Sequence, residues 1–379
     1  MSHSILPPSS AAVWSNCTGW VIMAACCPQL DSDASREGTA AHELAAKMIE
    51  SASKANLNMP HRANTIGTVS SNGVVITDEI FESAEEYAAD VIIVMGNMRV
   101  LGGPHFGIEQ KVACGRVHAD CFGTPDMFIY VAQLKTLYVW DFKNGHSIVE
   151  AFENKQMICY VSGIMDALGL SDLETRIVAR IVQPRAYHRE GTIREWTFMG
   201  HEIRSHINLL AIKAAEIMAS GGDCQSGAHC KWCQARHACD TALTAGMGLF
   251  EMVGVPVPVE LTASQLGTQL KIIQRALDQI SYLESGYSQQ VESLLRSGKS
   301  VPGYRLQESL GREKWTDAEA AQKAIGITIS KPGYITPKQA ITAGASKEIV
   351  KKYTEIPKTG LKVVPDDTNL ARKVFSYEQ

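Results

Sequence analysis

The chain has 379 residues, of which 45% are hydrophobic and 20% are charged, and its formal net charge is −4. This is the composition of a globular protein with one large or two medium-sized domains and an ample core. No apolar run approaches the length of a membrane span, and no apolar signal segment opens the chain. We therefore expect a cytoplasmic protein with no membrane partner.

The charge is unevenly distributed along the chain. Residues 299–379 carry 14 basic and 9 acidic side chains, so this tail is net positive while the rest of the chain is acidic. Mild overall acidity does not indicate nucleic-acid binding, which usually shows as an excess of Lys and Arg. The basic tail could still bind nucleic acid locally.

The hydrophobic pattern predicts alternating helices and strands over the first two thirds of the chain. A cysteine-bearing segment, residues 1–35, comes first. The predicted elements that follow are a helix at 36–55, a helix at 74–98, a strand meander at 107–143, a helix at 150–168, strands at 174–183 and 193–199, and a helix at 200–219. This order predicts an α/β fold in which helices flank a mixed central sheet.

A linker is expected at residues 253–258, followed by a long helix over 262–295. Its apolar positions recur at intervals of three and four, and they are Leu266, Leu270, Ile273, Leu277 and Ile280. We expect this stripe to pack on its own chain; dimerisation and DNA clamping remain alternatives. The tail mixes basic and aromatic residues, which suits either a surface that follows nucleic-acid phosphates or an ordinary solvated helix face.

A predicted hairpin brings three charged side chains together. With residues 132–136 as the turn, Val131 lies opposite Leu137, and Asp126 falls near residue 142. Side chains alternate along a strand, so Asp141 and Lys143 share a face. The sequence therefore predicts two carboxylates and an ammonium group at one edge of the sheet.

Carboxylates in such a place bind hard cations such as Mg²⁺ or Mn²⁺. A metal held there can activate water and stabilise charge on a phosphate, and a lysine can orient the water or offset developing negative charge. A D-x-K pair alone is a weak signal, because Asp and Lys two apart on a strand are usually a surface pair.

The ordered series of motifs resembles the PD-(D/E)XK nuclease superfamily, and within it the RecB-like branch that includes CRISPR-associated exonucleases. His42, in Glu37–Leu44, is similar to the histidine motif of the first helix. Asp126 matches the second acidic motif, and Asp141-Phe142-Lys143 matches the D-x-K motif. The spacing of Gln156 and Tyr160 matches the Q-x-x-x-Y motif that follows.

The resemblance implies a restriction-endonuclease-like core in a nuclease domain over residues 1–245, with a helical extension over 246–379. It implies that His42, Asp126, Asp141 and the carbonyl of Phe142 ligate Mg²⁺ or Mn²⁺, and that Lys143 orients or activates water. Gln156 and Tyr160 would lie near the site.

Each of these roles has a simpler alternative. His42 lies on a predicted helix with Asp33 or Ser35 as its N-cap, where a histidine is often only a structural polar group. Gln156 and Tyr160 share a helix face. In the simpler alternative, Gln156 is exposed to solvent and Tyr160 packs in the core. Glu109 is either an acid near the active site or a solvated strand residue.

The chain has 10 cysteines, which a cytoplasmic protein keeps reduced and available for metals. Cys230, Cys233 and Cys239 form a C-x2-C-x5-C pattern that is one ligand short of a four-coordinate site. Local candidates for the fourth ligand are Cys224, His229 and His237, which would suggest structural zinc. Three further cysteines are expected to be small core residues, namely Cys114, Cys121 and Cys159.

Iron–sulfur members of the RecB-like branch join three such cysteines to one upstream of the nuclease motifs. The position that matches is Cys17, although Cys26 and Cys27 compete with it. The resemblance thus implies a [4Fe–4S] cluster held by Cys17, Cys230, Cys233 and Cys239, with Zn²⁺ as the alternative.

The resemblance implies a metal-dependent deoxyribonuclease, expected to be an exonuclease acting on DNA with a free end. The segments Leu6–Cys17 and Glu37–His42 further resemble a phage and prophage family, which implies a role in recombination, replication or end-processing in the host cytoplasm. The phage context also implies a single-strand annealing protein as a candidate partner. The alternatives are a catalytically inactive DNA-binding module with a structural metal cluster and a zinc-bearing structural protein. The chain has no P-loop of the G-x-x-x-x-G-K-[ST] type, so we expect no helicase activity of its own.

Overall fold

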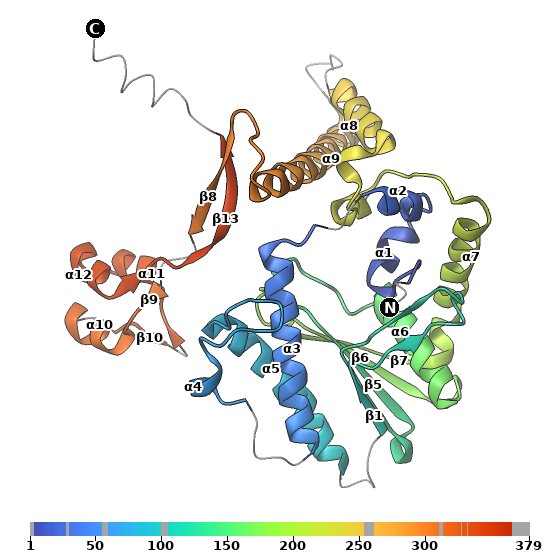
Figure 1. Ribbon diagram of the computed structural model, residues 1–379, viewed down its shortest axis with the longest axis horizontal. Coiled ribbons are helices and arrows are strands. Elements are labelled where there is room, and N and C mark those ends of the chain that lie inside the picture. Colours follow the sequence, from blue (N-terminus) through green and yellow to red (C-terminus); the bar gives the residue numbers. More distant parts are fainter. Residues whose placement is uncertain are drawn as a thin grey trace. The chain divides into compact units, whose positions relative to one another are not determined.

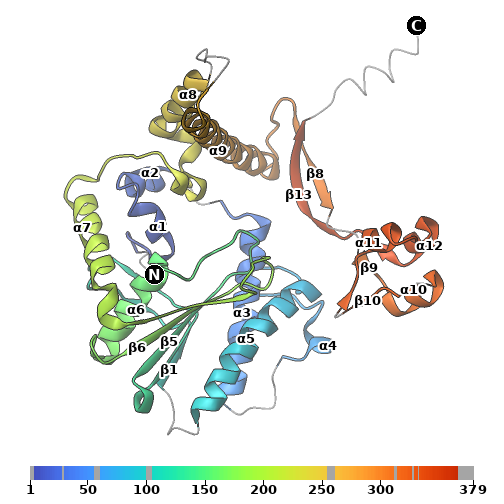
Figure 2. The same cartoon turned by 180° about the vertical axis from the view of Figure 1, so that it is seen from behind.

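The computed structural model describes residues 4–27, 30–54, 60–99, 105–253, 261–310, 314–326, 328–331 and 333–365. The chain divides into two compact units, Met1–Gly286 and Tyr287–Gln379 (Figures 1 and 2). None of the helices in these described ranges is both long and apolar enough to cross a membrane.

The first unit is built on one five-stranded sheet with helices on both faces, as the sequence predicts (Figure 1). Its strands are β1 (His105–Ile108), β4 (Met127–Val131), β5 (Thr136–Phe142), β6 (Arg176–Val182) and β7 (Ile193–Met199), with a separate short pair formed by β2 (Val112–Ala113) and β3 (Phe122–Gly123). Its helices are α1 (Ala11–Trp14), α2 (Trp20–Cys26), α3 (Asp33–Ser53), α4 (Arg62–Thr65), α5 (Asp78–Arg99), α6 (Lys155–Leu168), α7 (Arg204–Ser220) and α8 (Asp240–Val253). Helix α9 (Ala263–Arg296) crosses the division between the units.

The strand order is β1-β4-β5-β6-β7, and all neighbours are antiparallel except β5 and β6. Helix α6 makes the crossover between these two parallel strands. Strand β6 buries its apolar residues on both faces because it lies inside the sheet, while Arg180 forms ion pairs with Asp90 and Glu195. The sheet is therefore mixed, with its parallel pair at the centre of the unit.

Alternation along β4 and β5 sends side chains into two separate cores. Met127 and Trp140 pack on the side of α3 and α5, whereas Phe128 and Val139 pack on the side of α6 and α7. By the same alternation Asp141 belongs to the face of α6, together with Val139. The polar end of β5 thus lies between helices of both layers.

The expected hairpin forms, but its register differs by one residue. Val131 pairs with Thr136 rather than lying opposite Leu137, because the turn is a 3-10 turn over Ala132–Leu134 that closes with Lys135 in the left-handed conformation (φ 47°). Extending the register places Asp126 across from Asp141. Residues directly opposite in an antiparallel pair share a face, so this shift favours the convergence of the two carboxylates.

The predicted helices of this unit form, with small shifts at their ends. Neither Asp33 nor Ser35 caps α3: the cap is Ser32, whose side chain accepts a hydrogen bond from the Ser35 amide. Helix α6 starts after Asn154, whose side chain accepts from the amides of Gln156 and Met157. This cap fixes the first turn of α6, and with it the position of Gln156.

The last part of the chain is not purely helical, contrary to expectation. It contains α10 (Ala318–Ile325), α11 (Pro337–Thr342) and α12 (Lys347–Lys352). Three antiparallel strand pairs accompany them: β8 (Tyr304–Leu310) with β13 (Lys358–Pro365), β9 (Lys314–Trp315) with β12 (Thr354–Glu355), and β10 (Ser330–Lys331) with β11 (Gly333–Tyr334). A small core that includes Ala321, Ile329 and Val350 holds the three helices together.

Helix α9 packs through a face that its sequence pattern does not indicate. Its buried residues are Ala276, Gln279 and Gly286, while the apolar stripe expected to pack on the chain is 37–62% exposed. The division of the chain accordingly falls after Gly286, beyond the expected boundary at 245/246, which lies inside α8. Of the expected linker, residues 254–258 lie outside the described residues.

Two helical glycines provide a matched test of how closely α6 packs on β2. A Cβ on Gly163 of α6 would come within 2.6 Å of the Ala113 carbonyl oxygen, whereas nothing lies within 4 Å of one on Gly38 of α3. We expect Gly163→Ala to destabilise the protein by about 1–3 kcal/mol through overpacking, and Gly38→Ala to stabilise it by up to about 1 kcal/mol through helix propensity. Chemical denaturation of both variants measures the difference; equal effects would mean that α6 does not pack this closely on β2.

Candidate functional site

Charged side chains from α3 and from the ends of β1, β4 and β5 meet at one edge of the sheet. We call His42, Glu109, Asp126, Asp141 and Lys143 the acidic cluster. His42 comes from α3, Glu109 follows β1, and Asp126 directly precedes β4. The antiparallel pairing of β1 and β4 brings the last two together, and the Glu109 amide donates to the Asp126 carbonyl oxygen at 3.0 Å.

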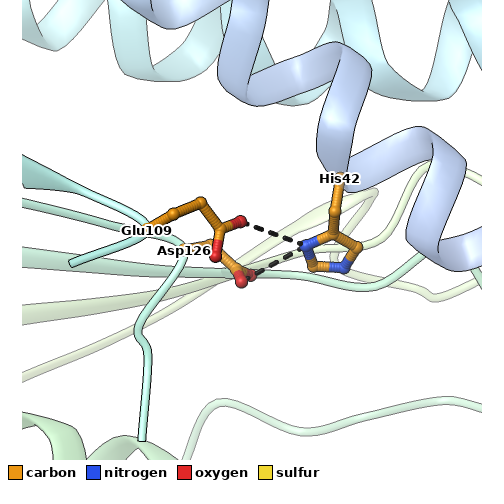
Figure 3. Close-up of side chains that lie close together, drawn as sticks. All are labelled: His42, Glu109 and Asp126. Carbon is orange, nitrogen blue, oxygen red and sulfur yellow. Dashed lines mark ion pairs between the residues drawn. The ribbon is translucent and has the colours of Figure 1, made fainter. Parts of the chain in front are cut away.

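Three side chains of the cluster point at one another (Figure 3). His42 Nδ1 lies 3.2 Å from Asp126 Oδ1 and 3.8 Å from Glu109 Oε1. Among the described residues, these three form the one group whose metal-binding atoms all lie within 4.8 Å of one another. Glu109 also has a left-handed backbone (φ 46°), which costs free energy for a non-glycine residue and is often found at functional sites.

Asp141, Lys143 and Gln156 form a connected network beside this group. Lys143 Nζ donates to Asp141 Oδ1 at 3.1 Å and to Gln156 Oε1 at 3.1 Å. Gln156 Nε2 donates to Asp141 Oδ1 at 2.8 Å. The Asp141 side chain is only 3% exposed, and its Oδ2 accepts no hydrogen bond although Lys143 Nζ lies 2.9 Å away. Asp141 Oδ2 is thus paired with Lys143 through charge rather than through a hydrogen bond.

The charges of the cluster are strongly coupled. Burial opposes ionisation of Asp126, but His42 and Lys143 hold the pKa of its carboxyl below the usual range. Burial and the nearby Asp126 raise the pKa of Asp141 despite Lys143. His42 is desolvated, yet Asp126 and Glu109 raise its pKa to about 10. The His42 imidazolium and the Lys143 ammonium group are therefore the two cations that balance these carboxylates.

Phe142 and Tyr160 are buried next to the cluster. The Phe142 amide donates to Asp126 Oδ2 at 2.6 Å, and its ring lies between His42 and Tyr87, with ring centroids 5.0 and 4.8 Å away. Tyr160 is 5% exposed, and burial together with Asp141 raises the pKa of its hydroxyl. Tyr160 thus lies in the core beside Gln156 and Asp141.

A second constellation lies where the N-terminal segment meets residues 224–239. Five cysteines line one pocket, which we call the cysteine pocket: Cys17, Cys224, Cys230, Cys233 and Cys239. His229 also lines it, but Cys26, Cys27 and His237 do not. Cys26 is exposed, and the trio Cys114, Cys121 and Cys159 is fully buried in the core, as expected.

Backbone contacts hold the two sides of the cysteine pocket together. The Gly19 amide donates to the Asp223 carbonyl at 2.9 Å, and Gln234 Nε2 donates to the Ala24 carbonyl at 2.7 Å. Two amides point at sulfur: Gln225 N–H donates to Cys17 Sγ and Gly227 N–H to Cys230 Sγ, both at 3.4 Å. Such contacts stabilise a thiolate, the form in which cysteine binds a metal.

A comparison with known protein families finds a match that spans most of the chain. The profile of DUF2800, described as a protein of unknown function, matches residues 3–370. The chain belongs to the DUF2800 family. The match covers both constellations and almost all of the C-terminal unit of this DUF2800 protein.

The sequence pointed to most, but not all, of the residues that meet in this DUF2800 protein. The structure brings together every residue assigned to the acidic cluster from sequence and every cysteine assigned to a cluster. It also adds Cys224 to the cysteine pocket, where sequence spacing offered it only as one of three local candidates. Ser15, whose hydroxyl accepts from Lys155 Nζ at 2.7 Å, ties the N-terminal segment to α6 and had no signal in the sequence.

Proposed function

We propose that this protein is a metal-dependent deoxyribonuclease of the PD-(D/E)XK type, cleaving phosphodiester bonds in DNA with a free end. The observation that carries the proposal is the convergence of Asp126, Asp141 and Lys143 at the ends of paired strands. A helix, three antiparallel strands, a crossover helix and a parallel strand follow one another as α3, β1, β4, β5, α6 and β6, and this order supports the same nuclease-like core. Helices α4 and α5 and the β2–β3 pair are inserted between them.

The donor set fits a hard divalent cation. Asp126, Glu109 and His42 present oxygen and nitrogen atoms within one small space, and Asp141 Oδ2 is a buried carboxylate oxygen whose partner is the Lys143 ammonium group. Carboxylate oxygens are the preferred ligands of Mg²⁺ and suit Mn²⁺. We propose that Asp126 and Asp141 hold the ion, with His42, Glu109 and the Phe142 carbonyl as further candidates. A bound cation would lower the pKa of water and offset charge on the phosphate.

The remaining residues of the cluster have distinct tasks. Lys143 keeps a raised pKa because Asp141 and Asp126 outweigh its burial, so it stays an ammonium group at neutral pH. It can orient the attacking water and balance negative charge on the phosphate. Gln156 bridges Lys143 and Asp141 and therefore fixes the direction of both side chains.

We further propose that the cysteine pocket holds a structural [4Fe–4S] cluster. Four thiolate ligands suit an iron–sulfur cluster. The amide-to-sulfur contacts at Cys17 and Cys230 stabilise the thiolate form that such a cluster needs. Cys17, Cys230, Cys233 and Cys239 are the proposed ligands, with Cys224 as the alternative to Cys17.

The test of the proposed activity uses anaerobically purified protein. End-labelled linear and closed circular DNA, each single- and double-stranded, is incubated with Mg²⁺ or Mn²⁺. Degradation of linear DNA alone supports an exonuclease, while nicking of circles supports an endonuclease. A metal-loaded protein with an intact cluster that binds all four substrates but cleaves none would instead be a DNA-binding module.

Glu109 gives a test that does not depend on cleavage. We expect Glu109→Gln to weaken Mn²⁺ binding about 10- to 100-fold, because the carboxylate lies next to both His42 and Asp126. Titration calorimetry with Mn²⁺ measures the change. Glu50→Gln on α3, which removes an exposed carboxylate paired with Lys54, is the matched control. Unchanged affinity in Glu109→Gln would make Glu109 an ordinary solvated residue.

A further inference from the structure

The C-terminal unit contains two short helices that the proposed nuclease site does not use. Helices α11 and α12 are separated by the four residues 343–346, and α12 packs against both α10 and α11 (Figure 1). Gly344 in this turn has φ +102°, a conformation that favours glycine. Two helices joined by a turn of three or four residues with a glycine are typical of a helix-turn-helix.

The start and the inner face of this element are well defined. Thr336 and Gln339 form a capping box at the first turn of α11, with Pro337 at the first helical position. Ala340, Ala345 and Val350 are buried, one from α11, one from the turn and one from α12. These three buried residues, five apart in the sequence, attach both helices to the same small core. The opposite face of α12 is exposed.

That outer face is basic. Lys347, Lys351 and Lys352 are exposed, with Glu348 as the one acidic side chain among them. No aromatic residue lies within α12, so the face offers no platform on which unpaired bases could stack. Lysines on an exposed helix instead suit phosphate groups on either side of a groove.

We propose that α11 and α12 form a helix-turn-helix that binds double-stranded DNA, with α12 entering the major groove. The groove of B-form DNA is about 12 Å wide and admits a helix, whereas that of double-stranded RNA is too narrow for side chains to read. Helix α12 has no Arg, Asn or Gln, and its lysines are assigned to phosphate groups, which carry no sequence information, so we expect little sequence preference. This inference does not rest on the proposed nuclease activity.

The test measures binding of the full chain to a fluorescent duplex of about 20 base pairs by anisotropy, without added divalent cation so that nothing is cleaved. The variant Lys347→Gln/Lys351→Gln/Lys352→Gln is expected to bind about tenfold or more weakly at about 50 mM salt, with a salt slope lower by about 2–3 because each lost phosphate contact contributes about 0.9. Wild type should bind the duplex more tightly than the corresponding single strand.

The matched control is Lys299→Gln/Lys323→Gln/Lys362→Gln, which removes the same charge from exposed positions of the same unit outside α11 and α12. It should retain duplex affinity within about threefold. The proposal fails if the α12 variant binds like wild type, if both variants lose affinity equally, or if wild type prefers single strands. A protein that shows the expected binding but never cleaves DNA would overturn the proposed nuclease and leave this inference intact.

Discussion

Asp141→Asn is expected to reduce DNA cleavage by at least about 1,000-fold while leaving the fold intact, a loss of about 4 kcal/mol in transition-state stabilisation. The substitution keeps the shape of the side chain, and the amide oxygen can still accept from Gln156 and Lys143. It removes the negative charge and replaces Oδ2, which is ion-paired with Lys143, with an amide nitrogen that cannot bind a cation. Initial rates of end-labelled DNA degradation in Mn²⁺ measure the effect.

Two further variants separate this loss from a general effect of charge. Lys143→Met should reduce the rate about 100- to 1,000-fold by removing the ammonium group while Mn²⁺ binding persists. Asp31→Asn, at an exposed position ahead of α3, should cleave like wild type. A residual activity in Asp141→Asn of more than about a tenth of wild type would place the cation on other residues.

Cys230→Ala is expected to abolish the iron–sulfur chromophore and to lower the melting temperature by about 10 °C or more, because cluster binding contributes directly to folding free energy. Cys230 is 6% exposed and its sulfur accepts from the Gly227 amide. Three measurements, made under anaerobic conditions, check this expectation. They are the absorbance at about 400 nm, the iron and zinc content, and thermal unfolding. A wild-type protein that contains zinc and no iron would exclude the iron–sulfur cluster.

Three other cysteine variants identify the fourth ligand. Cys17→Ala should behave like Cys230→Ala, and Cys224→Ala should retain the chromophore. The reverse result would make Cys224 the ligand and leave Cys17 as a neighbour. Cys26→Ala is the control, since Cys26 is exposed and lies outside the pocket; loss of the chromophore there would contradict the assigned position of the site.

The layered sheet could be predicted because its elements carry clear periodicity. Residues 174–183 were expected to form a strand and contain β6, and helix-spaced apolar residues predicted α3, α5 and α6 within a few residues. The order of Asp126, Asp141 and Lys143 along the chain was enough to expect them at one edge. Alternation fixes which side chains share a face once a strand is assigned.

Features that depend on backbone geometry or on distant contacts could not be predicted. The hairpin register depends on a 3-10 turn whose last residue, Lys135, has no sequence signature for φ 47°. The convergence of Glu109 on His42 depends on a left-handed backbone in a glutamate. The apolar stripe of α9 suggested a packed face, but close approach of Gly286 to Arg236 and His237 decides which face packs.

The position of Cys17 opposite residues 224–239 has a consequence for the order of events during synthesis. More than 200 residues separate Cys17 from Cys230, and closing a loop of that length costs about 5 kcal/mol in chain entropy. Leu6 and Trp14, both fully buried in the finished fold, therefore leave the ribosome long before their final surroundings exist. The beginning of the chain is among the last parts to become fixed, and until then its apolar side chains are available to chaperones.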